Sequence, residues 1–533
     1  MRRRAALLVL AWLTVGLPGL DAEGDRWWAH VRFLADDALE GRDTGSPGYL
    51  KAAAYVAGEF QKAGLTPAGT DGYLQPVTFR SRRILEEKSS LALVRGSKVE
   101  PITLGDEATI SMRVDPAPQL EAPLVFVGHG LRIPEATYDD LAGLDLRGKV
   151  VLFLSGGPSR ISGPLLSHYQ SVRWSYLKDT GALGTLSITN PRGMDIPWER
   201  SILSRFQPSL TLADPALDET AGQKLSVTVN PARADKFFAG TGHTLKEILA
   251  LADAGKPLPR FELSASLRAT VAVRSDDVES PNVVALLPGS DPVLKDEYVV
   301  LSAHLDHVGV GEPFGSAQGR SINGDRIYNG AMDNASGIAG LIETAVALGE
   351  ARPKLRRSLV FLAVTAEEKG LLGSRFYANH PTVPVDRIVA NLNTDMFLPI
   401  IPMHSVNVSG FEESDLADDV RKAAKALGVE VLPDPEPERN IFTRSDQYSF
   451  IKRGVPAIFP RIGFRKDSPE HEIMKRWRTE RYHAPSDDLN QPVDFKAAAD
   501  FNRLYLAIVE SVANRPVRPR WNADSFFRRF AQP

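Results

Sequence analysis

Five side chains of the types that bind divalent metal ions stand where apolar runs end, before a helical pattern, or near the end of the chain. The candidate ligands are His304, Asp333, Glu368, Asp395 and His483. Two imidazoles and three carboxylates form a set suited to a pair of zinc-like ions. Because a carboxylate has two oxygens, one aspartate of such a set could bridge two metals about 3.5–4 Å apart. The set predicts a dimetal centre that performs hydrolysis.

Two further acidic residues suit supporting roles. Adjacent side chains of an extended backbone point to opposite sides, so Glu367 and Glu368 should have different roles. One glutamate would bind a metal and its neighbour would face the bound water. Asp306 stands two residues after His304 and could accept the second ring proton of that histidine. The other eight histidines, His307 among them, are given no metal-binding role.

The elements that must position these side chains follow the order of an α/β fold. Apolar runs typical of buried strands alternate with helical patterns after about residue 281. The expected strands are 282–287, 298–303, 359–364, 388–392, 406–408 and 457–459, and the expected helices are 336–348, 371–378 and 495–512. This order predicts a mostly parallel, mixed sheet covered by helices on both faces. Such sheets bind ligands beyond the carboxyl ends of their strands, where most of the candidate ligands stand.

The middle of the chain has a different texture. From 81 to about 275, short β-rich runs alternate with Pro and Gly turns, and helical periodicity is weak. Three prolines between 116 and 123 suggest a boundary. We therefore expect a β-rich segment, 117–277, inserted between two parts of the main domain, 23–116 and 278–515. A tail of residues 516–533 carries aromatic side chains that we expect to pack back onto the domain.

Composition bounds the class of function. The 533 residues are 43% hydrophobic and 24% charged, as in ordinary globular chains. A formal net charge of −3 gives no indication of a nucleic-acid partner. Cysteine is absent, which excludes disulfides, thiolate zinc sites and a cysteine nucleophile. Any metal must therefore be held by His, Asp and Glu.

The first residues predict export. Three arginines precede an apolar run, 5–17, that ends at Pro18 and Gly19. A basic start, a short apolar core and a small-residue end are typical of a secretory signal, expected here over 1–22. The run is shorter than the roughly 20 residues that span a bilayer, and no later stretch reaches that length. We expect a periplasmic or secreted protein with no stable membrane span.

The motifs together resemble the co-catalytic di-zinc aminopeptidase family, which includes bacterial leucyl aminopeptidases and glutamate carboxypeptidase-like enzymes. The residues that carry the resemblance are 39–42, 44–48, 303–309, 324–337, 365–374, 393–395 and 482–483. The inserted β-rich segment resembles the protease-associated domain found in many members. One departure is Gln447, where several members have a histidine near the substrate.

The resemblance implies roles for the candidate residues and two Zn²⁺ ions per chain. It assigns one zinc ion to His304 and Asp395, the other to Glu368 and His483, and the bridge between them to Asp333. By the same resemblance, Glu367 would be the general base and Asp306 would support the histidine two residues before it.

The implied function is a zinc-dependent metallopeptidase that acts on peptide substrates. The expected activity is that of an aminopeptidase, which releases N-terminal residues by attack of a zinc-bridging water that Glu367 activates. Two alternatives stay open. One is a carboxypeptidase or glutaminyl cyclase-like amidohydrolase of the same fold, and the other is a non-catalytic binding protein. The oligomeric state also stays open.

Overall fold

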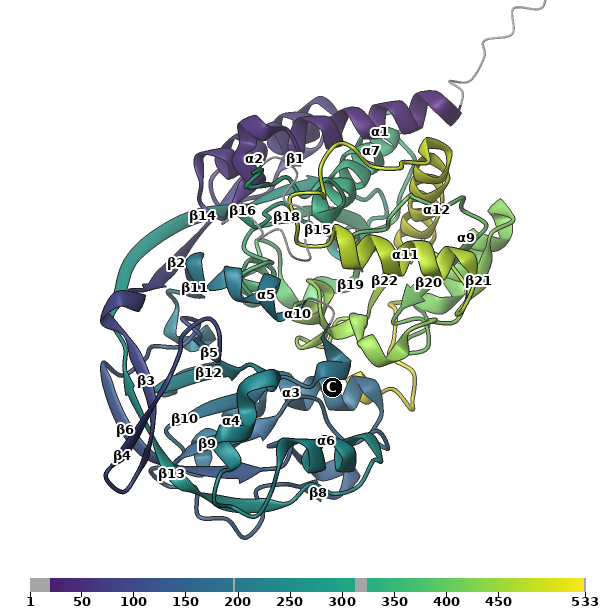
Figure 1. Ribbon diagram of the computed structural model, residues 1–533. Helices are drawn as coiled ribbons and strands as arrows, with labels where there is room; N and C mark the ends of the chain where they lie inside the picture. Colours follow the sequence, from purple (N-terminus) through teal and green to yellow (C-terminus); the bar gives the residue numbers. More distant parts are fainter. Residues whose placement is uncertain (1–19, 195–196, 312–323, 532–533) are drawn as a thin grey trace, which may run out of the picture.

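Two β-sheets organise the chain, one beneath α1 and the other around β6 and β13 (Figure 1). The computed structural model describes residues 20–194, 197–311 and 324–531. The first sheet has ten strands in the order β11-β2-β14-β18-β15-β19-β22-β20-β21, with β1 paired to β14. They are β1 (Thr66–Pro67), β2 (Leu74–Ile84), β11 (Ser209–Leu212), β14 (Val273–Leu287), β15 (Tyr298–His304), β18 (Ser358–Val364), β19 (Ile388–Asn393), β20 (Ser405–Ser409), β21 (Glu430–Leu432) and β22 (Ala457–Ile462).

The centre of the ten-stranded sheet is parallel. β18, β15, β19 and β22 run in the same direction, whereas β14, β2 and β11 form an antiparallel flank on one side and β20 is antiparallel to β22 on the other. The predicted α/β class with a mixed sheet is therefore confirmed. The carboxyl ends of β15, β18 and β19 consequently lie at one edge of the sheet.

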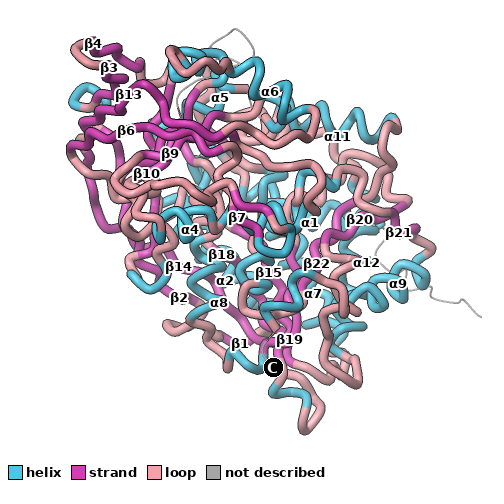
Figure 2. Tube along the Cα trace, turned by 90° about the horizontal axis from the view of Figure 1, so that it is seen from below, coloured by secondary structure: helices cyan, strands magenta, loops and turns pink. Residues whose placement is uncertain are grey.

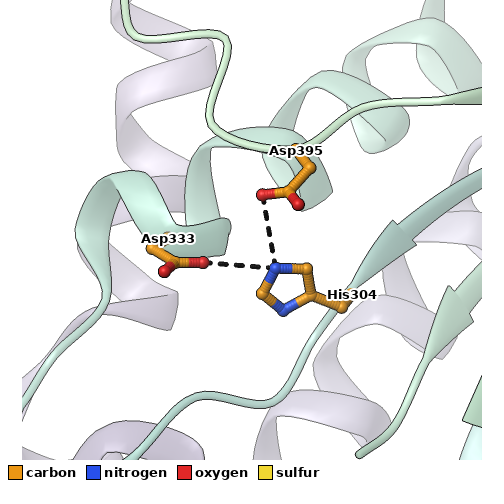
Figure 3. A group of neighbouring side chains, drawn as sticks. All are labelled: His304, Asp333 and Asp395. Carbon is orange, nitrogen blue, oxygen red and sulfur yellow. Dashed lines mark ion pairs between the residues drawn. The ribbon is translucent and has the colours of Figure 1, made fainter. Parts of the chain in front are cut away.

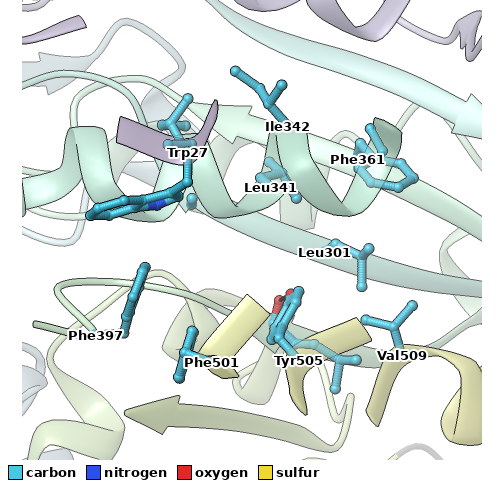
Figure 4. Close-up of a cluster of buried hydrophobic side chains, with 14 of the residues drawn as sticks. Trp27, Leu301, Leu341, Ile342, Phe361, Phe397, Phe501, Tyr505 and Val509 are labelled. Atoms are coloured by element: carbon cyan, nitrogen blue, oxygen red, sulfur yellow. Dashed lines mark hydrogen bonds between the residues drawn. The ribbon is translucent and has the colours of Figure 1, made fainter. Parts of the chain in front are cut away.

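Helices cover both faces of the sheet. Successive side chains of a strand point to opposite faces, and in the central strands both sets are apolar, so both faces must be covered. In β15, Leu301 packs on one face with α1, α2, α7, α9 and α12, and Val300 packs on the other with α8 and α10. These helices are α1 (Leu20–Leu34), α2 (Pro47–Lys62), α7 (Ser336–Ala351), α8 (Leu372–Asn379), α9 (Leu416–Leu427), α10 (Gln447–Ile451) and α12 (Phe495–Ala513). Figure 4 shows part of the first cluster.

The N-terminal helix is tied to the core beside the strand ends. Trp27 is fully buried, and its indole nitrogen donates a hydrogen bond to the Ser336 carbonyl at 3.0 Å. Its ring lies 5.6 Å from Phe397, which stacks on Phe501 at 4.1 Å (Figure 4). Burial of each such ring contributes about 2–3 kcal/mol. These contacts fix the start of α7, which follows directly on Asp333.

The second sheet has eight strands, in the order β4-β3-β13-β6-β9-β10-β12-β5. They are β3 (Ser90–Arg95), β4 (Lys98–Ile102), β5 (Ala108–Ile110), β6 (Gln119–Val127), β9 (Val150–Leu154), β10 (Gly184–Ile188), β12 (Leu225–Val229) and β13 (Arg260–Thr270). Helices α3 (Gly163–Ser171), α4 (Arg173–Asp179) and α6 (Leu245–Asp253) accompany them. Seen from below, β3, β4 and β13 gather at the opposite end of the molecule from α9 (Figure 2).

The second sheet draws on residues before the expected boundary at 117. β3 belongs to it because it pairs with β13, β4 because it pairs with β3, and β5 because it pairs with β12. In contrast, β11, within 117–277, pairs with β2 of the first sheet. A long antiparallel ribbon of β2 and β14 joins the two regions, from the pair Leu74–Val283 to the pair Ile84–Val273. We propose that the inserted domain spans about 85–272, with β11 returning to the first sheet.

The sequence predicts a signal segment at the start of the chain and, at its end, a tail that packs onto the domain. The predicted signal segment lies outside the described residues except for 20–22, which form the first turn of α1. In the tail, Trp521 and Phe527 are buried against Phe442 and Tyr448, so its aromatic side chains do pack back onto the fold. Over the residues that the structure describes, no helix combines the length and apolar character needed to cross a membrane.

Candidate metal centre

The candidate ligands are carried by turns at the strand ends. His304 is the last residue of β15, Asp395 follows β19 by two residues, and Glu367-Glu368 follow β18 after a two-residue link. Residues beside or within these turns have left-handed backbone angles, with φ of 55° at Ala366, 45° at Met396 and 50° at His483. Such angles are uncommon outside glycine and turn the chain sharply. The turns bring side chains from distant segments to one edge of the sheet.

A separate loop holds Asp333. The loop enters through Gly330 with φ of 59°, where an added Cβ would lie 2.2 Å from the Asp333 carbonyl oxygen and 2.6 Å from the His307 ring. Asp487 accepts hydrogen bonds from the main-chain nitrogens of Met332 and Asp333, both at 3.0 Å. The peptide bond between Asp333 and Asn334 is cis. The carboxylate at 333 therefore projects from a rigidly bonded loop.

Arg42 anchors this loop to the start of the chain. Its guanidinium group is fully buried and donates to the main-chain oxygens of Leu34, Leu305, Asn329 and Gly330. This arginine belongs to the motif 39–42 that carries part of the family resemblance. Its contacts identify the motif as a structural clamp on the strand end and the loop.

One group of three side chains converges at His304 (Figure 3). Its Nε2 lies 3.2 Å from Asp333 Oδ1 and 3.4 Å from Asp395 Oδ1. The other ring nitrogen, Nδ1, donates to the main-chain oxygen of Asp306 at 3.1 Å, which leaves Nε2 directed at the two carboxylates. Ser445 donates to Asp395 Oδ2 at 2.7 Å and so orients that carboxylate.

A second group converges on the other oxygen of Asp333. His483 Nε2 lies 3.2 Å from Asp333 Oδ2 and 3.0 Å from Glu368 Oε2. The two oxygens of one aspartate thus face two different histidines. This is the arrangement expected of a carboxylate that bridges two ions.

The donor set fits a pair of cations. Asp395 Oδ1 is buried and has no hydrogen-bond partner among the described residues, so it lacks the partner that a buried oxygen requires. The negative charge of the surrounding carboxylates also changes the pKa of His304. Burial alone would lower the pKa of His304, but the charges of Glu367 and Asp395 outweigh it and raise that pKa. Excess buried negative charge at converging N and O donors is compensated by divalent metal ions such as zinc.

Asp306 acts through different atoms from those predicted. We expected its carboxylate to accept the ring proton of His304, but its main-chain oxygen does so. The carboxylate instead accepts from the main-chain nitrogens of Glu367 at 3.0 Å and Glu368 at 3.3 Å. It is fully buried, and burial raises its pKa to about 6. Asp306 therefore holds the turn that carries both glutamates.

His307 is a site residue that the sequence reasoning missed. It is fully buried, and its Nδ1 lies 2.8 Å from Glu368 Oε1 and 4.0 Å from Asp333 Oδ2. Its Nε2 has no hydrogen-bond partner among the described residues. Its place in the same strand-end motif as His304 was the available signal, but the direction of its ring depends on the fold.

Glu367 and Glu368 are both half-buried, but their carboxylates have different surroundings. Glu367 lines the same hollow as His304, Asp333 and Asp395. None of the hydrogen bonds found within the described residues ends on its carboxylate, in contrast to Glu368. Burial, together with its negative neighbours, raises the pKa of Glu367 well above the usual value. The side chain is thus free to accept a proton from a molecule bound in the hollow.

Gln447 faces the interior. It is fully buried, accepts from Asn393 at 2.9 Å and donates to the main-chain oxygens of Ile441 and Phe442. The histidine of other family members was expected near the substrate, but this glutamine supports the chain beneath β19.

Two hollows flank the candidate centre. The first, about 880 Å³ including space open to solvent, contains His304, Asp333, Glu367, Asp395 and His483 in its lining, together with residues of β22 and α11 (Pro469–Glu480). The second, about 1640 Å³ on the same measure, reaches Glu368 and His483 from the side of the inserted domain, including Met112 and Arg113. A substrate could therefore extend to both sides of the centre.

Comparison with known proteins agrees with this geometry. Residues 282–509 match the model of Peptidase family M28, and they include all five candidate ligands. Leupeptin-inactivating enzyme 1 of Streptomyces exfoliatus is 27% identical over 249 residues, which are 45% of this chain and 50% of that enzyme. The probable leucine aminopeptidase 2 of Aspergillus oryzae is 27% identical over 43% of this chain and 42% of its own length. The chain thus spans half or less of the length of these relatives.

The whole fold also has a solved counterpart. The aminopeptidase from Aneurinibacillus sp. strain AM-1 superposes with a TM-score of 0.54 at 20% sequence identity, over 93% of this chain and 95% of that one. The two proteins share a fold, including the α/β arrangement predicted from the sequence. The family match identifies the α/β part of the chain as a metallopeptidase domain. Residues 282–509 belong to Peptidase family M28.

Proposed function

We propose that the protein is a zinc-dependent aminopeptidase with two zinc ions per chain. The observation that carries the proposal is the position of Asp333, whose two oxygens face His304 and His483 at 3.2 Å each. One ion would be held by His304 and Asp395 and the other by Glu368 and His483, with Asp333 shared between them. Bound zinc would polarise the scissile carbonyl and lower the pKa of water toward neutrality.

Glu367 is the proposed general base. Its carboxylate lines the hollow beside both ligand groups, so it would accept the proton of the attacking water and then deliver it to the leaving amine. Asp306 would fix the position of this glutamate through its main-chain nitrogen. His307 would hold Glu368 in place, since its Nδ1 contacts the Oε1 oxygen while Oε2 faces His483.

Peptides are the proposed substrates, with cleavage after the N-terminal residue. The names of relatives such as leucine aminopeptidase 2 of Trichophyton rubrum, 29% identical over 38% of the chain, support this choice. The two hollows on either side of the centre are consistent with it, because one would take the N-terminal side chain and the other the remaining peptide. Export remains our prediction from residues 1–22 and is tested by the mass of the N-terminal peptide of the mature protein.

The deciding experiment compares free and blocked substrates. We expect the purified protein to hydrolyse aminoacyl anilides and peptides with free N-termini, and to leave N-acetylated ones intact. A chelator should abolish the activity, zinc should restore it, and metal analysis should find about two zinc ions per chain.

Other outcomes would favour the alternatives. Cleavage of N-acetylated peptides from the C-terminus would indicate a carboxypeptidase. One zinc ion per chain with cyclisation of N-terminal glutamine would indicate the cyclase variant. A zinc-free protein whose folding ignores the chelator and that turns over no substrate would indicate a binding protein.

A further inference from the structure

The first hollow contains an unusual amount of positive charge. Its lining includes four arginines from three separate segments, Arg439, Arg444, Arg461 and Arg478. Among the described residues that line it, the carboxylates are Asp333, Glu367 and Asp395 alone, and all three belong to the candidate metal centre. Bound zinc would neutralise those three carboxylates.

Two of the arginines pair with a single carboxylate, and a third lies in the same group of charges. Glu436 Oε1 lies 2.5 Å from Arg478, and Glu436 Oε2 lies 3.5 Å from Arg439. Arg461, on β22, is part of the same electrostatic group. Burial lowers its pKa, the charges of Arg439 and Arg478 add to that effect, and Asp434 and Glu436 oppose it. Arg461 thus has Asp434 and Glu436 as acidic neighbours and two further arginines beside it.

Arg461 is the least satisfied of them. Its Nε is buried without a hydrogen-bond partner among the described residues, while its guanidinium carbon lies 5.5 Å from the centre of the Phe459 ring. A buried N–H without an acceptor costs about 1–3 kcal/mol, which an anionic ligand would recover. The planar fork of arginine matches a carboxylate in particular.

The fourth arginine connects this group to the metal centre. Arg444 is exposed and directly precedes Ser445, whose hydroxyl orients Asp395. Between the charged groups, the walls are apolar and include Met396, Ile441 and Phe464. Such walls suit the methylene groups of a side chain whose end is charged.

Resting on the proposed aminopeptidase function, we propose that this hollow selects peptides whose N-terminal residue carries a carboxylate, glutamate or aspartate. The scissile bond must lie at the metal centre, so the side chain that enters the same hollow belongs to the residue beside that bond. Its carboxylate would bind Arg461 and its neighbours. The free C-terminal carboxylate of a short peptide has the same chemistry and is the other source to be distinguished.

The test compares kcat/KM for glutamyl, glutaminyl and leucyl anilides with the wild-type protein. Glutamine has nearly the shape of glutamate without its charge. We therefore expect kcat/KM to be at least about tenfold higher for the glutamyl than for the glutaminyl anilide, and we expect added salt to reduce this difference. Equal or better turnover of glutaminyl anilide overturns the proposal. Cleavage of N-acetylated peptides with free but not amidated C-termini also overturns it, because the bound carboxylate is then the C-terminal one.

Variants locate the charge that is responsible. Arg461→Met should lower the ratio of glutamyl to glutaminyl kcat/KM about tenfold. Arg444→Met should also lower this ratio, and because Arg444 is exposed, this variant serves as the test if Arg461→Met does not fold. The matched control is Arg465→Met, since Arg465 is 64% exposed and pairs with Glu430 outside the hollow. An unchanged ratio in both hollow variants overturns the assignment. If no anilide is cleaved by the wild type, the aminopeptidase function itself has failed, whereas cleavage without acidic preference removes only this inference.

Discussion

Two buried aspartates, one in each region of the molecule, have different surroundings. Asp140, beside the end of β6, accepts from Tyr138 at 2.6 Å and from the main-chain nitrogens of His129 at 3.0 Å and Leu131 at 3.2 Å. Asp395, beyond β19, accepts from Ser445 on one oxygen, and its other oxygen is buried without a partner among the described residues. Both are largely buried. The oxygen that accepts no hydrogen bond, at converging N and O donors, is what supports Asp395 as a proposed ligand.

The two regions also differ in their buried carboxylates. In the second region, Asp140 is satisfied within the fold, although nitrogens of Arg95, Arg173 and His243 are buried without a hydrogen-bond partner among the described residues. In the first region, the carboxylate oxygens without such a partner are on Asp43, Asp395 and Asp446. Satisfied groups stabilise a structure, whereas unsatisfied ones are retained where a ligand supplies the partner.

The strongest test of this contrast is Glu367→Gln. Loss of the proposed base should lower kcat by a factor of about 10²–10⁴, while metal analysis still finds the same zinc content. Retained turnover would remove Glu367 from its role.

A buried glutamate of the same sheet region provides the matched control. Glu297 accepts from Arg357 and Arg518, each at 2.8 Å, so Glu297→Gln should change thermal stability and keep kcat within about threefold. A loss of kcat as large as that of Glu367→Gln would mean that any buried glutamate gives the effect.

Asp395→Asn should separate ligand from structural aspartate. We expect the zinc content to fall from two toward one per chain and kcat/KM to fall at least about 100-fold. Full zinc occupancy in the variant would show that the free oxygen is not a ligand.

His307→Gln should have a smaller effect of the same kind. Its ring contacts Glu368 and not the substrate, so we expect zinc affinity to fall by about 10–100-fold and activity to recover at high zinc concentration. Competition with a chelator of known affinity measures this. Wild-type affinity in the variant would leave the buried ring with a packing role only.

Asp140→Asn should reverse the pattern. Replacement of a carboxylate that accepts three hydrogen bonds should cost about 1–3 kcal/mol of unfolding free energy in the second sheet. Zinc content and kcat of the folded protein should stay within about threefold of wild type. A loss of zinc would contradict the separation of the two regions.

A last prediction concerns how His129, in the second region, makes the stability of the fold depend on pH. Burial lowers the pKa of His129 to about 4, and its Nδ1 donates to the Leu154 carbonyl, so the folded protein holds it neutral. Below about pH 6.5 the unfolded chain binds a proton that the folded one does not, so stability should fall between about pH 6.5 and 4, by about 3 kcal/mol.

His129→Asn keeps a donor to the carbonyl and should flatten this part of the stability curve, as measured by urea unfolding at several pH values. His404→Asn, at an exposed histidine, should leave it unchanged. An unchanged slope in the first variant would assign the acid sensitivity to other groups.

Local patterns were enough to locate the central strands and the metal centre. The apolar runs 298–303, 359–364 and 388–392 match β15, β18 and β19 to within a residue, because buried parallel strands are nearly continuous apolar segments. Since the carboxyl ends of these strands share one edge, the residue types at those ends were enough to predict that the candidate ligands lie close together.

What could not be predicted depends on long-range pairing and on side-chain direction. The boundary at 117 followed the prolines, whereas β3 joins the second sheet through β13, more than 160 residues away in the chain. The roles of Asp487 and His307 depend on which atom faces which loop. The arginines of the first hollow come from three segments whose proximity is fixed by the fold.

The β2–β14 ribbon has a consequence for how such a protein could be assembled from parts. The chain leaves the ribbon after Ile84 and returns at Val273, two residues that are partners in the ladder, and the next pair, Leu85 and Ala272, still share a hydrogen bond of 2.9 Å. The inserted domain thus occupies the place of a hairpin turn, and a two-residue turn would be the shortest link able to replace it. Its removal would uncover Val77 and Phe79, which β11 now helps to bury, so a shortened enzyme would need polar residues at these two positions.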